Sequence, residues 1–458
     1  MKRYFYTLGI SQQHIRNPWI YGSLIVFLFG IALARIIPPL QSPDEDSHLM
    51  RAYAISQGQW SLVSAPNQSS GSQVDIGLLE FIEGNLHNLR TPGWRPSVQA
   101  QSRLREITWQ GATNFVSSPG TGYYNPLIYL PQAIGLWLGQ SFDWTIAHTY
   151  QLCRLLSTLL VLSIIGLAFQ TYMPNPLAIG LLILPMSLFQ ILMPTIDGIC
   201  HALTLLILCW FVRLQQESAK KDLPIAFAVL LVLLITCRLY ALPLLLLILA
   251  INLPQSKPTL RQWLLFALSL FIVGIWSLWA QTHITDLRVS QTLSTLLILQ
   301  YYLQHPSVWL EVFFNTLGSE EIWGFYGKSF IGLLGWLHIG LPAWCYPLGG
   351  TFLVCMGLLS LRPMRLNASN NLVNRLVFFI PALLSIALIF NLILFTWTPF
   401  PNKIIEGVQG RYFWIPACTF AFGLGLSKPM TSLTKMLLGA ALIFNFVIIY
   451  FSYLNAYY

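Results

Sequence analysis

The densest group of acids in the chain follows its first long apolar segment. Residues 38–48 read Pro-Pro-Leu-Gln-Ser-Pro-Asp-Glu-Asp-Ser-His, so Asp44 and Glu45 lie close to His48 and to Arg51. A carboxylate at a membrane surface, where water is partly excluded, can have a raised pKa and act as a general base toward a hydroxyl group. Asp44 and Glu45 are therefore candidate catalytic bases. His48 and Arg51 are candidates for orienting an acceptor.

The same string also has a purely structural interpretation. Ser42 can cap a helix that begins at Pro43, with the acids in the positively polarised first turn. A third interpretation is a weak divalent-metal site, because His48 lies one helical turn from Asp44 and Glu45. We expect no tightly bound cofactor, although the spacing permits a divalent metal.

Cations that could hold a phosphate lie in or beside apolar sequence. Arg411 opens an apolar segment, and Gly407 and Gly410 before it would let backbone approach a phosphate or pyrophosphate closely. Arg154 and Arg238 lie within apolar sequence, where a charge must be paired or face water-filled space. Snorkelling to the membrane surface is the alternative for Arg411.

Four more polar residues are expected near these cations. Tyr124 belongs to the string Tyr-Tyr-Asn-Pro-Leu-Ile-Tyr, which could bind a lipid phosphate or simply form an interfacial aromatic belt. Asp197 lies between two apolar segments, where an acid in a loop is tolerated. Gln409 and Tyr412 belong to the string Gly-Val-Gln-Gly-Arg-Tyr-Phe and, like His48 and Arg51, are candidates for orienting an acceptor.

The elements that position these residues must be membrane helices. Of the 458 residues 55% are apolar and 9% are charged, whereas soluble domains average about 25% charged residues. This composition excludes a soluble enzyme, a disordered tail and a nucleic-acid-binding module. The seven cysteines lie in or at the ends of apolar segments, so neither a disulfide framework nor a zinc ribbon is expected. We predict one all-α transmembrane domain over residues 1–458.

Apolar segments that could span a membrane, singly or as paired short helices, occur near residues 18–37, 146–170, 176–194, 198–214, 223–253, 260–282, 343–361, 375–397, 411–426 and 435–454. The segment 223–253 is too long for one span and has Arg238 in its middle. We therefore predict that it turns at Arg238, which gives about eleven crossings in total.

The positive-inside rule predicts the orientation. With a cytoplasmic N-terminus, every short-loop cation falls inside: Arg213, Lys220, Lys221, Lys257, Arg261, Arg362, Arg365, Arg375, Lys428 and Lys435. This holds only if the segment Asn125–Gly139 lies at the outer interface without crossing. Ala32-Leu33-Ala34 resembles a signal-peptidase site, but we expect an uncut helix, because it tethers the acids that follow.

The predicted orientation leaves three segments outside, near residues 38–145, 283–342 and 398–410. In the first, only Asp46–Trp60 has a long helical period. The second contains amphipathic stretches at Leu293–Leu303 and Val308–Leu317.

Taken together, these strings resemble a known family. Pro-Asp-Glu-Asp-Ser-His, Tyr-Asn-Pro-Leu-Ile-Tyr, Arg154, Asp197, the stretch 324–342 and Gly-Val-Gln-Gly-Arg-Tyr-Phe occur in an order similar to that of the predicted bacterial membrane proteins called domain of unknown function 2142. The resemblance covers most of the chain. The Asp-Glu pair after the first helix is shared more broadly with polytopic glycosyltransferases of the C-type fold (GT-C).

The wider resemblance implies a GT-C-like helical bundle that transfers a sugar from a polyprenyl-phosphate donor. The acceptor would be an envelope glycan, lipid or protein at the extracytoplasmic face of the bacterial cytoplasmic (inner) membrane. Asp44 or Glu45 would be the base, Tyr124 would lie near the donor lipid, and Asp197 would orient the acceptor. Arg411 is our candidate for holding the leaving phosphate, with assistance from other cations: Arg154, Arg238 or Lys328.

Two other functions stay open at this point. A transporter or flippase of an envelope glycolipid should place ionisable residues at the membrane midplane, whereas a transferase should gather them at one face. The sequence favours one face and has no visible internal repeat. A glycan polymerase or ligase would use the same donor chemistry and differ only in its substrates.

Overall fold

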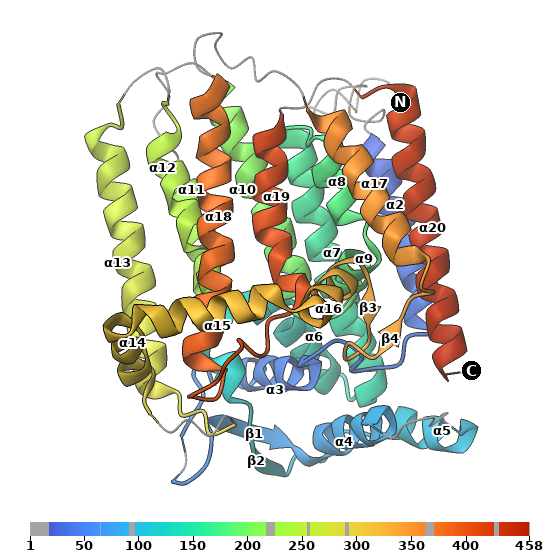
Figure 1. Cartoon of the computed structure of the whole chain (residues 1–458). Coiled ribbons are helices and arrows are strands. Elements are labelled where there is room, and N and C mark those ends of the chain that lie inside the picture. The colour runs from blue at the N-terminus through green and yellow to red at the C-terminus, as the bar shows by residue number, and fades with distance from the viewer. Residues whose placement is uncertain are drawn as a thin grey trace, which may run out of the picture.

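The computed structural model describes residues 18–64, 66–90, 97–216, 225–253, 257–288, 293–361, 371–425 and 430–457. Several cations used in the orientation argument lie outside these residues: Lys220, Lys221, Arg362, Arg365 and Lys428. Within the described residues the chain is mainly helical and forms a bundle (Figure 1), with only two short antiparallel strand pairs.

Five helices of the described chain are long and apolar enough to cross a membrane: α7 (Ile146–Thr171), α10 (Asp197–Gln216), α13 (Leu260–His283), α18 (Asn371–Thr396) and α20 (Ser432–Tyr457). Shorter apolar helices run beside them: α2 (Pro18–Ala34), α11 (Ile225–Cys237), α17 (Cys345–Ser360) and α19 (Trp414–Leu424). The prediction of a helical membrane protein is confirmed. The count of eleven crossings stays a prediction.

Two of the apolar segments are broken. Residues 176–194 form α8 (Pro176–Leu182) and α9 (Pro185–Leu192), and Asn445 of α20 donates to the Ile183 carbonyl at the break, at 2.6 Å. Residues 223–253 form α11, the 3₁₀ helix η4 (Leu239–Leu245) and α12 (Leu246–Ala250). Arg238 lies between α11 and η4 with non-helical backbone angles (φ −139°, ψ 82°), so the predicted turn is confirmed.

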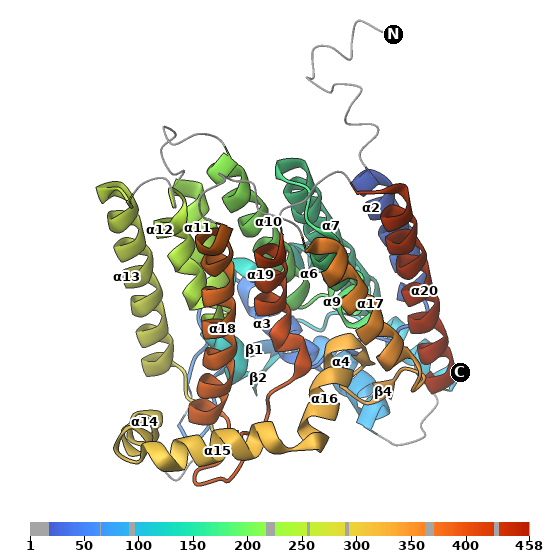
Figure 2. The same cartoon turned by 45° about the horizontal axis from the view of Figure 1, so that its top comes forward.

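One end of the bundle carries most of the remaining structure, which we call the cap (Figures 1 and 2). The cap consists of α3 (Glu45–Ser56), β1 (Gly71–Asp75), α4 (Ile76–Arg90), α5 (Val98–Glu106), β2 (Thr113–Ser117), η2 (Pro119–Tyr123), η3 (Pro126–Tyr129), α6 (Leu130–Ser141), α14 (Thr295–Gln304), α15 (Pro306–Gly318), α16 (Glu320–Ile331), β3 (Leu333–Leu334) and β4 (Ile339–Gly340). β1 pairs with β2 so that Gly71 faces Ser117. The helix η5 (Gly410–Phe413) joins the cap end to α19.

The cap agrees with part of the predicted outer structure. The amphipathic stretches of the second outer segment form α14 and α15, and α15 lies across the bundle (Figure 1). The segment Asn125–Gly139 contains α6, whose 12 residues extend over about 18 Å, whereas the hydrocarbon core is about 30 Å thick. α6 is therefore too short to cross alone.

Two expectations about the cap are wrong. α3 begins at Glu45, not at Pro43, and Ser42 does not cap it: its backbone N–H donates to the Glu45 carboxylate at 2.8 Å, and its hydroxyl has no hydrogen-bond partner among the described residues. The first outer segment also contains α4 and α5, although only Asp46–Trp60 showed a long helical period. In the second segment, α16 follows the two helices that form from the predicted amphipathic stretches. α4 was not predicted because its glycines and turn-type polar residues, such as Gly77, Gly84 and Asn85, interrupt the helical spacing of its apolar residues.

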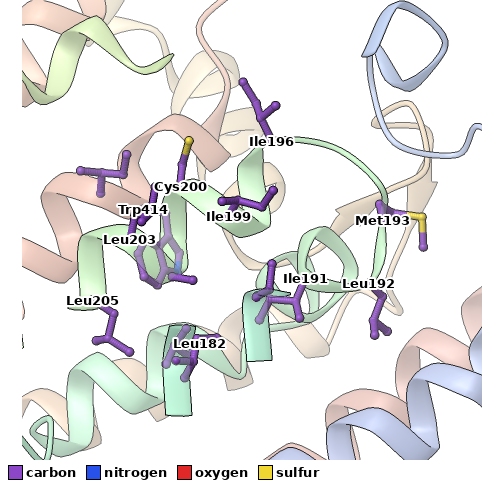
Figure 3. Packing of buried hydrophobic residues seen from close by; sticks show 14 of the residues in the cluster. Leu182, Ile191, Leu192, Met193, Ile196, Ile199, Cys200, Leu203, Leu205 and Trp414 are labelled. Atoms are coloured by element: carbon purple, nitrogen blue, oxygen red, sulfur yellow. The ribbon is translucent and has the colours of Figure 1, made fainter. Parts of the chain in front are cut away.

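The core of the bundle surrounds α10. Nearly all side chains of α10 are buried, and those of Cys200 and Leu203 belong to the same apolar cluster as Trp414 of α19. Figure 3 shows this cluster, which also includes residues of α9 and of the loop that joins α9 to α10. Because α10 is enclosed on all sides, its first residue, Asp197, has a fixed position at the cap end.

Asp75 ties three parts of the cap together. Its buried carboxylate accepts hydrogen bonds from the backbone N–H groups of Gly77, Leu78, Gln110 and Gly111, at 2.8–3.3 Å. These contacts join the end of β1 to the start of α4 and to the loop before β2.

We expect Asp75→Asn to destabilise the cap by about 1–3 kcal/mol, because an amide NH₂ would then face backbone N–H groups. Thermal unfolding in nanodiscs and the rate of tryptic cleavage at Arg103 and Arg105 of α5 measure this effect. Asp143→Asn is the matched control, since Asp143 is exposed and its left-handed backbone (φ 52°) suits asparagine. Equal cleavage rates for the two variants would contradict the assignment.

Candidate functional site

A buried carboxylate is shared by two arginines where the bundle meets the cap. Arg238, at the turn after α11, forms an ion pair with Oδ1 of Asp197 through Nη2. Arg411, in η5, approaches the other oxygen, Oδ2, with Nη1 at 3.2 Å. The three side chains are only 5–9% exposed. With two guanidinium groups and one buried carboxylate, this group of side chains has an excess of positive charge and can attract an anion.

Asp44 is the member of the site that faces solvent. Its carboxylate Oδ2 lies 3.7 Å from Nη2 of Arg411, and its side chain is 57% exposed, compared with 5% for Arg411. Asp44 precedes α3 with a left-handed backbone (φ 61°). Arg411 therefore bridges a buried acid, Asp197, and an accessible acid, Asp44.

Glu45 points into the protein. Its side chain is fully buried and accepts hydrogen bonds from the Ser42 backbone N–H and from the Tyr150 hydroxyl. Burial raises the pKa of Glu45, and these two hydrogen bonds oppose the rise. Glu45 thus has the geometry of a structural residue, and Asp44 is the acid that an incoming hydroxyl could reach.

Aromatic rings line the α3 side of the site. The ring of Tyr124 lies 5.1 Å from the guanidinium carbon of Arg238 and 6.0 Å from the ring of His48. His48 Nδ1 shares a hydrogen bond with the Tyr129 hydroxyl at 2.8 Å. Burial lowers the pKa of His48 to about 4, so its imidazole is neutral at pH 7 and the arginines supply the positive charge.

Gln409 and Tyr412 hold the guanidinium of Arg411 in place. Nε of Arg411 donates to Oε1 of Gln409 at 2.7 Å, and the Tyr412 ring lies 5.5 Å from the guanidinium carbon. Arg411 therefore uses three sides of its planar group, toward Gln409, Asp197 and Asp44. Both residues proposed from the sequence thus contact the candidate phosphate-binding arginine.

Three other candidates have different partners. Arg154 donates to the carbonyls of Ile37 and Leu192, at 3.3 and 3.5 Å, and lies on the Tyr150 side of α3. Arg51 donates to the Trp60 carbonyl at 2.6 Å and so ties α3 to the chain after it. Lys328 is exposed, 6.0 Å from the ring of Tyr346.

The side chains proposed as a weak metal site diverge. Asp44 faces Arg411, Glu45 faces Tyr150, and His48 faces Tyr129. In the part of the chain that the structure describes, no group of three or more His, Cys, Asp and Glu side chains could hold a metal ion. The sequence spacing of Asp44 and His48 therefore does not produce a ligand set.

Two residues near Asp197 were not predicted as site residues from the sequence. Gln190 of α9 donates to its Oδ2 at 3.3 Å. His201, one turn further along α10, stacks on Trp414 with 4.0 Å between ring centroids. The spacing of four residues between Asp197 and His201 on a helix could have identified His201, whereas the contact with Gln190 depends on the break between α8 and α9.

Arg288 is a further residue near the site that the sequence did not predict. It pairs with Asp286 at 2.6 Å, and its guanidinium carbon lies 5.1 Å from the Trp397 ring. Burial tends to lower the pKa of Arg288, but the carboxylates of Asp286 and Asp44 raise it above its usual value. Arg288 is thus within electrostatic range of Asp44, and no sequence signal connects these distant residues.

We expect Asp197→Asn to destabilise the protein by about 3–5 kcal/mol, because it leaves two buried guanidinium groups without their carboxylate. Thermal unfolding in nanodiscs measures the loss. Glu406→Gln is the control, since Glu406 is exposed and its carboxylate accepts a hydrogen bond from the Asn402 side chain at 2.7 Å. An unchanged unfolding temperature for Asp197→Asn would contradict the pairing, and adding Arg238→Gln to it should restore part of the stability.

Comparison with known proteins places the chain in a family. A family model described as a predicted membrane protein (DUF2142) matches residues 27–418, which include all the site residues described above. No curated protein and no solved structure matches the chain. Because the matched region covers most of the sequence, the chain belongs to the DUF2142 family of predicted membrane proteins.

Proposed function

We propose that this protein is a membrane glycosyltransferase that moves a sugar from a polyprenyl-phosphate donor to a cell-envelope acceptor. One observation carries the proposal: the accessible carboxylate of Asp44 lies 3.7 Å from the buried guanidinium of Arg411. A carboxylate can take a proton from an acceptor hydroxyl, and a guanidinium can hold a phosphate. Glycosyl transfer from a lipid phosphate needs both groups within the reach of one sugar.

The distribution of charge supports an extracytoplasmic site. Arg213, Arg261, Arg375 and Lys435 lie near helix ends at the end of the bundle opposite the cap. The positive-inside rule assigns that end to the cytoplasm and the cap to the outside. We propose that the N-terminus is cytoplasmic, that the chain crosses the bacterial cytoplasmic membrane about eleven times, and that the bundle is GT-C-like.

In the proposed reaction the acceptor oxygen forms a bond to the anomeric carbon of the donor sugar. The bond between that carbon and the phosphate oxygen breaks, and its electron pair leaves with the polyprenyl phosphate. Asp44 takes the hydroxyl proton, and direct displacement inverts the anomeric configuration. Arg411 stabilises the charge that develops on the leaving phosphate.

The remaining site residues have supporting roles in this proposal. Asp197 fixes Arg411 and Arg238, and Gln409 orients the Arg411 guanidinium. Tyr124 packs against Arg238 and in this proposal lies near the donor lipid. A divalent metal is not required by the steps above.

The position of the charges favours a transferase over a transporter. Asp197 is the first residue of α10, Arg238 follows the last residue of α11, and Arg411 precedes α19. The group therefore lies at helix ends, whereas a transport pathway is expected to have ionisable residues near the midplane. A polymerase or ligase of lipid-linked glycans would share this donor chemistry and differ in its acceptor.

Asp44→Asn is expected to lower sugar transfer about 10²–10⁴-fold, because the general base is lost. The unfolding temperature should not change, since the Asp44 side chain is 57% exposed. The assay uses membranes from a native strain in which each variant replaces the chromosomal copy of this protein. It follows the transfer of radiolabelled sugar from a panel of undecaprenyl-phosphate hexoses to the acceptors in these membranes.

Glu45→Gln is the matched variant for Asp44→Asn. It is expected to lower the unfolding temperature, because the buried carboxylate accepts from Ser42 and Tyr150. Full transfer activity in the Asp44→Asn protein would contradict the assigned base.

Arg411 should determine affinity for the donor lipid. We expect Arg411→Lys to weaken binding of undecaprenyl phosphate about 10-fold and Arg411→Ala to weaken it further, because lysine keeps the charge but loses the forked geometry. Binding to the purified protein can be measured by microscale thermophoresis in detergent. Lys403→Ala is the control, since Lys403 is an exposed cation of the same loop. Equal affinities for all four proteins would remove Arg411 from the donor site.

A further inference from the structure

A separate cavity lies beside the first transmembrane helix. It has a volume of about 760 Å³ and lies between α2, α7 and the cap helices α4 and α5. In Figure 1, α4 and α5 lie below the ends of α2 and α20. Asp44, Asp197, Arg238 and Arg411 do not line this cavity, so it is distinct from the proposed transfer site.

The cavity has two chemically different parts. Its apolar part comes from transmembrane helices and includes Phe27 and Ile31 of α2 and Leu155 of α7. Ile31 is 45% exposed and Leu155 is 39% exposed, as expected for side chains at an opening toward the hydrocarbon of a membrane.

Its polar part is cationic. The cavity lining includes Arg35, just after α2, Arg105 on α5 and Arg154 on α7, together with His148. Arg154 is only 4% exposed. Among the described residues that line the cavity there is no Asp or Glu. The positive charge of these arginines is therefore not balanced by a carboxylate in the cavity lining.

The size and position of the cavity identify the class of ligand. A volume of 760 Å³ is typical of a pocket for an organic molecule and exceeds the needs of a single phosphate ion. A ligand that matches both parts has an anionic head and an apolar chain. Guanidinium groups prefer phosphate, to which they can donate paired hydrogen bonds.

We propose that this cavity binds a second lipid, one with a phosphate-bearing head group. The head group lies among Arg35, Arg105 and Arg154, and the chain lies along α2 and α7. This site is additional to the donor site at Arg411 and does not depend on the glycosyltransferase proposal.

The cavity borders the segment that positions Asp44. Arg154 donates to the carbonyl of Ile37, and its guanidinium carbon lies 5.9 Å from the ring of Tyr150. The Tyr150 hydroxyl in turn donates to Glu45, the neighbour of Asp44. A lipid head group at Arg154 therefore lies against the chain that leads from α2 to Asp44.

The test uses the full-length protein in detergent and a fluorescent phosphatidic acid as the probe. Phosphatidylcholine with the same chains serves as the zwitterionic comparison, and inorganic phosphate serves as a soluble competitor. We expect phosphatidic acid to bind at least 10-fold more tightly than phosphatidylcholine. Millimolar inorganic phosphate should not displace it, because the chain contributes to binding.

Two arginines on one helix provide the matched variants. Arg105 lines the cavity, whereas Arg103, two residues earlier on α5, does not, and both are exposed. Arg105→Glu is expected to weaken phosphatidic acid binding at least 10-fold, while Arg103→Glu leaves it unchanged. The unfolding temperatures of both variants should match that of the parent, because neither side chain is buried.

Three results would overturn the proposal. Equal weakening by Arg103→Glu and Arg105→Glu would indicate general attraction to a basic surface. Equal affinity for phosphatidylcholine would exclude a phosphate-selective head-group site, and displacement by inorganic phosphate alone would indicate a free-anion site. Arg411→Ala should not alter this binding, so failure of the donor-site proposal can be distinguished from failure of this one.

Discussion

The buried carboxylate of Asp197 is the interaction on which the arrangement of the site depends. It holds Arg238 and Arg411 from different parts of the chain at the end of α10, where an unpaired guanidinium would be strongly unfavourable. The enclosed position of α10 fixes the carboxylate, and the carboxylate fixes both cations. Arg411 can therefore present one edge of its guanidinium to Asp44, at 3.7 Å, while another edge approaches Asp197 at 3.2 Å.

The second constraint is the turn before α3, which sends two adjacent acids in opposite directions. The left-handed backbone of Asp44 leaves its side chain exposed, while Glu45 begins the helix and is buried against Tyr150. Asp44 is therefore available to a substrate, whereas its neighbour Glu45 has a structural role. The Tyr150 and Arg154 side of this turn lies next to the proposed lipid cavity. The chain segment between α2 and α3 therefore borders both the lipid cavity and the proposed transfer site.

Local patterns in the sequence predicted much of the fold. Apolar runs located the long helices, the charge at Arg238 located the break after α11, and the placement of the loop cations argued against a crossing by Asn125–Gly139. α4, α5 and α16 were missed because glycines and mixed polarity weaken their periodicity. The pairing of Asp197 with Arg411 joins residues 214 positions apart, and the exposed Asp44 has a left-handed backbone in the turn before α3. Neither can be inferred from local sequence, so the residue types of the site were predictable but their partners were not.

The central claim is that Asp44 and Arg411 flank the reacting phosphate and sugar of a lipid-linked donor. The most direct measurement is a cryo-EM map of the protein in nanodiscs with undecaprenyl phosphate. Our account predicts phosphate density within hydrogen-bonding distance of the Arg411 guanidinium, on the side that faces Asp44. Density for the phosphate near the membrane midplane, with Asp44 and Arg411 facing bulk water, would contradict the account and favour transport.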